Sequence, residues 1–206
     1  GVAQAGYLLA GVVVGTQLGL QATSFYLAAY LLMNVAAFAV VIARERVSEH
    51  GDDITSLQDL GRSSPLLAWP MTIAMLSLAG FPATAGFIGK FYLIDASVAG
   101  DYTWLGIAIV IGSVISLAYY LRVIAAVWMR SPSEALARPP LTPGGRPAIA
   151  GGSAEADTPP PRRLIQVEVL FVAILFAVAT VVFGIYPDPL MNIARDAGAA
   201  LTSLVS

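Results

Sequence analysis

Long apolar stretches separated by short polar ones make up most of the chain. The first two, at about residues 2–20 and 22–43, are each close to the ~20 residues that a helix needs to cross a membrane. Only Gln21 and its neighbours separate them, so the pattern predicts a tight helical hairpin. Two later stretches, at about 103–128 and 164–186, predict two further spans.

The apolar stretch at 65–99 is too long for one straight crossing. As a continuous helix it would measure roughly 50 Å, against a hydrocarbon core of ~30 Å. Gly80, Pro82, Gly86 and Gly89 interrupt its helical pattern near the middle. The stretch therefore crosses either twice, as two short helices, or once, as a helix with a break.

The arginine distribution favours a single crossing. With one crossing, loops 44–64 and 129–163 lie on the same side of the membrane and together hold eight arginines; with two crossings, these divide three against five. Cytoplasmic loops are enriched in Lys and Arg, so both loops are predicted to be cytoplasmic. The eight are Arg44, Arg46, Arg62, Arg130, Arg138, Arg146, Arg162 and Arg163.

The predicted organisation has three parts. Residues 1–130 hold four transmembrane helices, including the broken helix at 65–99, and residues 131–163 form a Pro/Gly/Arg-rich loop expected to be disordered. Residues 164–206 hold the last span and an amphipathic tail expected to lie on the outer interface or to dock on a neighbour. The fold class is an all-α integral membrane protein of about five transmembrane helices, the third discontinuous.

Composition supports this class and narrows the chemistry. Hydrophobic residues make up 57% of the chain, charged residues only 12%, and the mean hydropathy is +0.77. Cysteine is absent, which excludes disulfides, thiolate metal sites and cysteine-held iron–sulfur clusters in this chain. The single histidine, His50, lies in a charged loop, so we expect neither a haem nor another metal site. No basic patch with interleaved aromatic residues supports nucleic-acid binding.

Lys90 is the candidate functional residue. It is the only lysine in the chain, and apolar sequence flanks it on both sides. A cation inside a membrane segment costs a few kcal/mol, so it indicates an ion or proton path. Burial disfavours the charged form of a lysine, which allows a neighbouring charge to control its protonation. The alternative is a side chain that extends to the outer interface.

The break supplies the surroundings that such a site needs. Unwound backbone at membrane depth is tolerated where it lines a polar cavity or is buried in protein. Its free carbonyl and amide groups can hold water, and a chain of water molecules conducts protons. Thr84 adds a hydroxyl near the break, and Tyr92 adds a phenol close to Lys90 in sequence.

Four other polar side chains lie inside predicted spans and could extend a hydrated path. Gln4 is expected near the cytoplasmic start of the first span, and Asn34 near the middle of the second, with Tyr30 one turn before it. Interhelical hydrogen bonding is the alternative for these residues. Arg122 lies near the cytoplasmic end of the fourth span, where its side chain can reach the interface.

Four motifs resemble the antiporter-like membrane subunits of respiratory complex I. They are, in the order of the family, AQAGYLL, YLAAYLLMNVAAFAVV, SLAGFPATAGFIGKFYLI and SLAYYLRVIAAVW. The combination is most similar to the subunit N family of bacterial NADH–quinone oxidoreductases. The resemblance covers residues 1–130 well, and the last helix only loosely, through VFGIYPDPL.

The resemblance implies a fold and a role. The family has fourteen spans with two inverted five-helix repeats, a helix broken in each, and these five segments correspond to the last five. Lys90 then matches the lysine of the second half-channel, while relatives often have histidine where this chain has Gln4. The first repeat, the N-terminal half of the subunit, is absent, and the chain opens without methionine, so we expect a fragment or processed product that is inactive alone.

The resemblance also implies partners and a location. The chain is expected to contact the lipid bilayer and other complex I membrane subunits in a bacterial plasma membrane. NADH, FMN, iron–sulfur clusters and quinone belong to partner subunits, and this chain contributes proton transfer without redox chemistry. One alternative is a subunit of a multisubunit sodium/proton antiporter or a membrane-bound hydrogenase. A second is a structural membrane subunit without a transport role.

Overall fold

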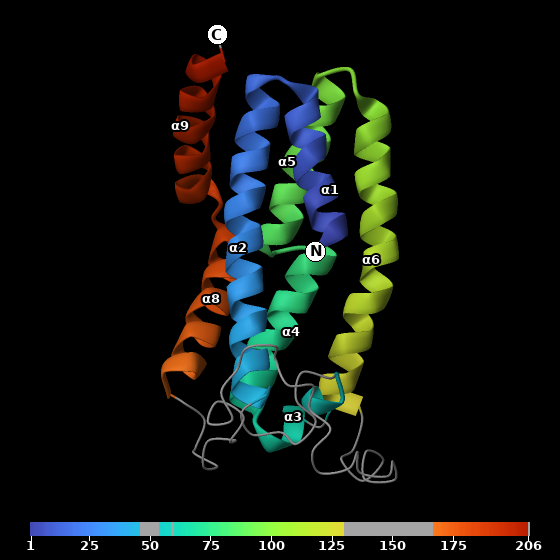
Figure 1. Ribbon diagram of the computed structural model, residues 1–206, viewed down its shortest axis with the longest axis vertical. Coiled ribbons are helices and arrows are strands. Elements are labelled where there is room, and N and C mark those ends of the chain that lie inside the picture. The colour runs from blue at the N-terminus through green and yellow to red at the C-terminus, as the bar shows by residue number, and fades with distance from the viewer. Residues whose placement is uncertain (46–53, 59, 130–166, 206) are drawn as a thin grey trace, which may run out of the picture.

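The computed structural model describes residues 1–45, 54–58, 60–129 and 167–205. These residues form a bundle of helices whose long axes run roughly in one direction (Figure 1). The elements are α1 (Val2–Val14), α2 (Gln17–Glu45), a 3-10 turn (Ile54–Leu57), α3 (Leu60–Ser63), α4 (Pro65–Ala79), α5 (Ala85–Ala99), α6 (Thr103–Met129), α8 (Val167–Ile185) and α9 (Asp188–Val205). The predicted loop at 131–163 lies outside the described residues.

The hairpin between α1 and α2 turns earlier than the hydropathy pattern predicts. The prediction put the turn at Gln21, whereas α1 ends at Val14 and α2 begins at Gln17. Gly15 closes α1 in the left-handed conformation (φ 66°), which glycine adopts without steric cost. The hydroxyl oxygen of Thr16 then accepts a hydrogen bond from the N–H of Gly19 at 3.1 Å, as an N-cap does.

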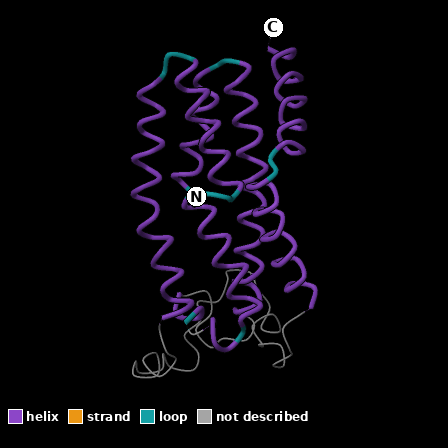
Figure 2. Tube along the Cα trace, turned by 180° about the vertical axis from the view of Figure 1, so that it is seen from behind, coloured by secondary structure: helices purple, strands orange, loops and turns teal. Residues whose placement is uncertain are grey.

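The apolar stretch at 65–99 forms two helices that follow one another along the bundle. Both views show α4 in one half and α5 in the other, with the connecting loop near mid-height (Figures 1 and 2). Gly80 and Pro82 lie in this break, but Gly86 and Gly89, which we expected to break the helix, are helical residues of α5. There, the missing side chains let α5 approach its neighbours closely.

The core surrounds α2, which packs against α1, α4, α5, α8 and α9. Its central residues Phe25, Ala29 and Met33 are fully buried. Small residues dominate this core, which allows the close helix contacts common in membrane proteins. The predicted amphipathic tail, α9, packs lengthwise on α2, with Met191 and Ala194 buried.

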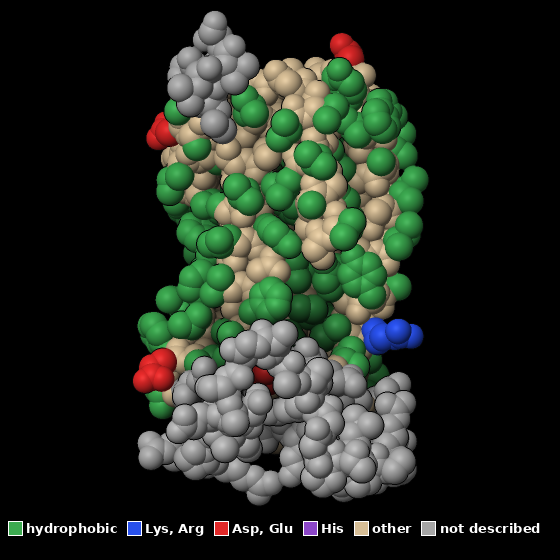
Figure 3. All heavy atoms as spheres, viewed as in Figure 1, with side chains coloured by type: hydrophobic (Ala, Val, Ile, Leu, Met, Phe, Trp, Pro, Cys, Tyr) green, Lys and Arg blue, Asp and Glu red, His purple; other side chains and the backbone are tan. Residues whose placement is uncertain are grey.

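The outer surface is that of a membrane protein. Among the described helices, α2, α6 and α8 are long and apolar enough to cross a membrane, and α1 and α4 are shorter apolar helices. Hydrophobic side chains cover most of the described surface on the face in Figure 3, and charged ones are few and lie toward the two ends. The chain is therefore an integral multi-pass membrane protein.

Candidate functional site at the helix break

The C-terminus of α4 leaves two backbone carbonyls for another donor. The last four carbonyls of a helix have no partner within it. At the end of α4, Gly80 N–H bonds Ser77 O at 2.9 Å and Phe81 N–H bonds Leu76 O at 2.9 Å, which is the Schellman pattern. The carbonyls of Leu78 and Ala79 remain, and both lie beside the break.

Lys90 supplies the missing donor. Its ammonium donates to Leu78 O at 2.9 Å and to Ala79 O at 3.2 Å, and the side chain is only 4% exposed. The negative end of the α4 dipole also favours a cation here. Although Lys90 belongs to α5, its ammonium therefore lies at the break itself and does not extend to the outer interface.

Gly80 makes room for the lysine. Its φ of 88° is left-handed, and a β-carbon at this position would lie 3.3 Å from Lys90 Nζ and 3.2 Å from Lys90 Cδ. Glycine is thus required here both for its backbone conformation and for its lack of a side chain.

The start of α5 is tied to the end of α4 by a buried serine. Ser77 is fully buried, and its hydroxyl oxygen accepts a hydrogen bond from Gly86 N–H at 3.0 Å. This bond satisfies one of the free N–H groups at the N-terminus of α5. A β-carbon at Gly89 would lie 2.6 Å from Tyr26 Cδ2, so α5 also sits directly on α2. These contacts set the position of Lys90 relative to α4.

Tyr7 of α1 covers the other side of the ammonium. Lys90 Nζ lies 5.1 Å from the centroid of the Tyr7 ring, within the range of a cation–π interaction. Such an interaction is worth about 2 kcal/mol or more when it is shielded from water. Among the described residues, no Asp or Glu forms an ion pair with Lys90. The carbonyl oxygens and the aromatic face therefore stabilise its charge.

Gln4 extends the site toward α2 and α6. Its Nε2 group donates to Leu78 O at 3.3 Å and to Tyr120 Oη at 2.9 Å, while its Oε1 accepts from Tyr26 Oη. Leu78 O is thus shared by Lys90 and Gln4.

The prediction placed Gln4 near the cytoplasmic start of its span, and this was wrong. Because α1 begins at the level of the break, Gln4 lies beside α4's last turn.

Three tyrosines at this site, Tyr7, Tyr26 and Tyr120, were not among the predicted residues. Each is at most 8% exposed. Tyr7 follows Gln4 by three residues on α1, a spacing that places both on one helix face and could have identified it. Nothing in the sequence brings Tyr26 and Tyr120 to Gln4, because they lie on other helices.

The other predicted site residues bond elsewhere. Thr84 donates to Phe81 O at 2.7 Å within the break. Tyr92 packs edge-on against Phe25, with 5.3 Å between the ring centroids.

Two further predicted positions also lie outside the lysine's hydrogen-bond network. Asn34 donates to the backbone oxygen of Tyr30 at 2.8 Å, within its own helix. Arg122 is exposed on α6. A path through any of these four side chains and Tyr30 stays a prediction.

Helix α8 packs directly against the break. A β-carbon at Gly184 would lie 2.6 Å from Ala83 O and would also meet the backbone of Thr84. Ala83 itself has a positive φ of 65°, which costs a non-glycine residue about 1–2 kcal/mol. Helix α8 therefore packs against a strained part of the break.

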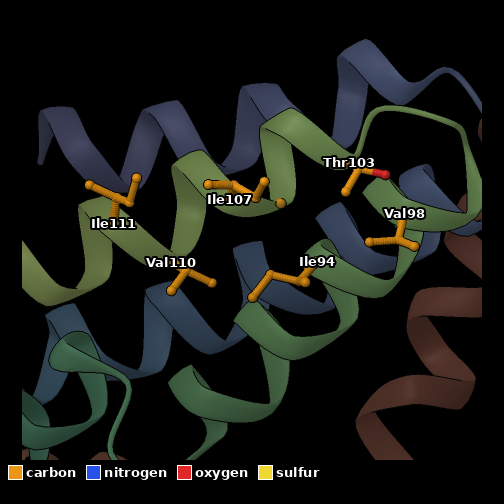
Figure 4. A pocket seen from close by; sticks show the side chains of 7 residues that line it. Ile94, Val98, Thr103, Ile107, Val110 and Ile111 are labelled. Carbon is orange, nitrogen blue, oxygen red and sulfur yellow. The ribbon is translucent and has the colours of Figure 1, made fainter.

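A separate hollow of about 230 Å³ lies between α5 and α6. Figure 4 shows its lining of Ile94 and Val98 from α5 and Thr103, Ile107, Val110 and Ile111 from α6. Its walls are almost entirely hydrocarbon, and Thr103 is the one lining residue with a polar side chain. Within the described parts of the chain, no group of three or more His, Cys, Asp or Glu residues could hold a metal ion.

The fold and the site define an all-helical, multi-pass membrane protein with a buried lysine at a helix break. Residues 1–116 match the family described as NADH:quinone oxidoreductase/Mrp antiporter, transmembrane. The chain belongs to this family, as the motifs of the broken helix predicted.

The curated relatives are named NADH-quinone oxidoreductase subunit N. That of Trichlorobacter lovleyi is 44% identical over 133 residues, 65% of this chain and 27% of the relative. Subunit N 2 of Chloroherpeton thalassium is 36% identical over 207 residues, 99% of this chain and 36% of the relative. The chain thus spans about a third of the length of these relatives.

Two solved structures share the fold. The Mrp complex from Dietzia sp. matches with a TM-score of 0.70 and 24% identity over 95% of this chain and 40% of the other. Respiratory complex I from Thermus thermophilus with bound aureothin matches with a TM-score of 0.65 and 23% identity. This match covers 90% of this chain and 36% of the other chain.

Proposed function

We propose that this chain is the C-terminal part of a proton-translocating subunit N of NADH–quinone oxidoreductase. In this proposal, Lys90 takes up and releases the translocated proton, and α4 with α5 forms one discontinuous crossing of a bacterial plasma membrane. The redox centres and the quinone site belong to partner subunits. The observation that carries the proposal is the buried Lys90 ammonium, held by two carbonyls that the break leaves free.

The geometry supports a group whose charge can change. A buried lysine with a carboxylate partner would be stabilised permanently in its charged form. Here the described partners are neutral carbonyls and an aromatic ring, so the balance between ammonium and amine depends on charges further away. Loss of the proton removes the charge-assisted part of both hydrogen bonds and frees the side chain to move. A change of charge in a neighbouring subunit would thereby drive proton release.

The arginine-bearing loops favour the proposed orientation. Arg44 lies in the last turn of α2 and Arg62 lies in α3, both at the end of the bundle where α2 ends and α4 begins. By the positive-inside rule, this end is proposed to face the cytoplasm. Proton uptake would then reach Lys90 from the α4 side, and release would proceed past α5.

The test replaces Lys90 in the full-length subunit within the assembled complex. We expect Lys90→Met to abolish NADH-driven proton pumping into inverted membrane vesicles. Arg195→Met is the matched control, because it removes a cation that is exposed on α9 and lies outside the predicted path, and pumping should persist. Unchanged pumping in the Lys90 variant would overturn the assignment and favour a structural subunit.

A second candidate is a subunit of a multisubunit sodium/proton antiporter. The likeness to the Mrp complex favours it, since the two folds match over 95% of this chain. The same vesicles separate the two candidates when sodium/proton exchange is measured without NADH. The antiporter would be favoured if Lys90→Met abolishes sodium/proton exchange while NADH oxidation and NADH-driven proton pumping remain intact.

A further inference from the structure

The hydroxyl of Tyr7 is buried without a hydrogen-bond partner. The side chain is 5% exposed, and its Oη atom has no partner among the described residues. Leaving a buried polar group unsatisfied costs about 1–3 kcal/mol. A phenylalanine would fill the same space without that cost. Packing alone therefore does not account for the hydroxyl of Tyr7.

The neighbouring polar groups already have partners. Both donors of the Gln4 amide and its acceptor oxygen are engaged, and Tyr26 donates to that oxygen. The Tyr7 ring lies against Lys90, with Nζ 5.1 Å from the ring centroid, yet Oη makes no hydrogen bond to Nζ. Among the described residues of this cluster, Tyr7 Oη is the buried polar side-chain atom that has no hydrogen-bond partner.

The hydroxyl is directed at a glycine of α6. A β-carbon at Gly112 would lie 2.9 Å from Tyr7 Oη, so any larger residue would press on the hydroxyl. Gly106, on the same helix, differs: a β-carbon there would meet Ile94 Cγ2 at 3.5 Å, an ordinary contact. The tip of the Tyr7 ring therefore packs against α6 at Gly112, where a side chain would displace the hydroxyl.

We propose that Tyr7 Oη binds a water molecule through which Lys90 exchanges its proton. This inference rests on the proposed function of Lys90. In the step, an Nζ–H bond of the ammonium breaks and the proton joins the water oxygen, which leaves a neutral amine and a hydronium ion. The hydronium passes its extra proton to the next water molecule, and the reverse sequence recharges the lysine. Tyr7 keeps its own proton and acts as a positioning residue.

The decisive variant is Tyr7→Phe, which removes one oxygen and retains the ring. If the hydroxyl is only a packing element, pumping stays unchanged and thermal stability stays equal or rises, because an unsatisfied group has been removed. Our proposal instead expects pumping to slow by about tenfold or more, the low end of what a lost proton-transfer group costs. Thermal stability should not fall, which separates this loss from a folding defect.

Second-site variants at Gly112 test the hydroxyl directly. In the Tyr7→Phe background, Gly112→Ser restores a hydroxyl close to the lost one, while Gly112→Ala fills the same space without it. We expect the serine to recover pumping and the alanine not to. In the wild-type background, Gly112→Ala should slow pumping and the matched Gly106→Ala should not.

The outcomes also separate this inference from the function on which it rests. If Lys90→Met abolishes pumping while Tyr7→Phe leaves it unchanged, the water site is overturned and the proposed function stands. If neither variant affects pumping, both are overturned. Equal recovery by Gly112→Ser and Gly112→Ala would also overturn the water site, because it would show that volume alone matters.

Discussion

Gly80 and Lys90 are in contact across the helix break, although they belong to opposite sides of it. A β-carbon at Gly80 would lie 3.3 Å from Lys90 Nζ, and Gly80 adopts a φ of 88°. The residue that ends α4 therefore also determines where the ammonium can sit.

Gly80→Ala should weaken both the fold and transport. The left-handed backbone costs an alanine about 1–2 kcal/mol, and its methyl group would displace the ammonium from Leu78 O. We expect a lower thermal midpoint in the solubilised complex and slower pumping in vesicles. Gly6→Ala is the control, because a β-carbon there meets nothing within 4 Å. Equal effects from both variants would contradict the contact.

Ser77→Ala should release the start of α5 from α4. It removes the acceptor of the Gly86 N–H and leaves that buried donor unsatisfied, at a cost of about 1–3 kcal/mol. Ser97→Ala is a matched control, since Ser97 is equally buried but bonds only Leu93 O in its own helix. Thermal unfolding should show a larger loss at Ser77. A comparable loss at Ser97 would mean that burial, and not the bond across the break, sets the cost.

Gln4→Leu should destabilise the cluster around Leu78 O. The leucine preserves much of the volume but removes the partners of Tyr26 and Tyr120, which costs about 1–3 kcal/mol for each group left unsatisfied. Because Gln4 and Lys90 share one acceptor, the effects of Gln4→Leu and Lys90→Met on thermal stability should be non-additive. Additive effects in this double-mutant cycle would argue against an energetic link through Leu78.

Gly184→Ala should push α8 away from the break. Its methyl group would overlap the backbone at Ala83 and Thr84, and overpacking of this kind costs about 1–3 kcal/mol. We expect a lower thermal midpoint and faster proteolysis of the solubilised protein. Ala177→Gly is the control at a buried position of the same helix. It removes a methyl group, so it changes helix propensity without introducing an overlap. If Gly184→Ala proves as stable as wild type, the close contact between α8 and the break is wrong.

The sequence predicted the class of protein because membrane burial imposes strict local rules. Apolar length predicted the long helices α2, α6 and α8, and Gly80 with Pro82 indicated where the stretch at 65–99 is interrupted. Lys90 was conspicuous because a lone cation in an apolar stretch has a high cost. None of this required knowledge of which helices are neighbours.

The hydropathy pattern did not locate the turn between α1 and α2. The α1–α2 turn was placed at Gln21 because a polar residue interrupts the apolar stretch there. The turn lies at Gly15 and Thr16, where backbone conformation and capping outweigh polarity. Likewise, Gly86 and Gly89 were predicted to interrupt a helix, but in α5 they permit close packing. Sequence alone does not separate these two uses of glycine.

By itself, the sequence determined that this chain is a membrane protein of the antiporter-like family with one buried lysine near a broken helix. Only the tertiary structure decided what surrounds that lysine. Leu78 O, Tyr7, Gln4 and Tyr120 come from three different helices, and their meeting depends on helix packing rather than on any local pattern. The partners of a buried charge are set by long-range contacts, because the groups that stabilise it must come from whichever helices the fold brings alongside.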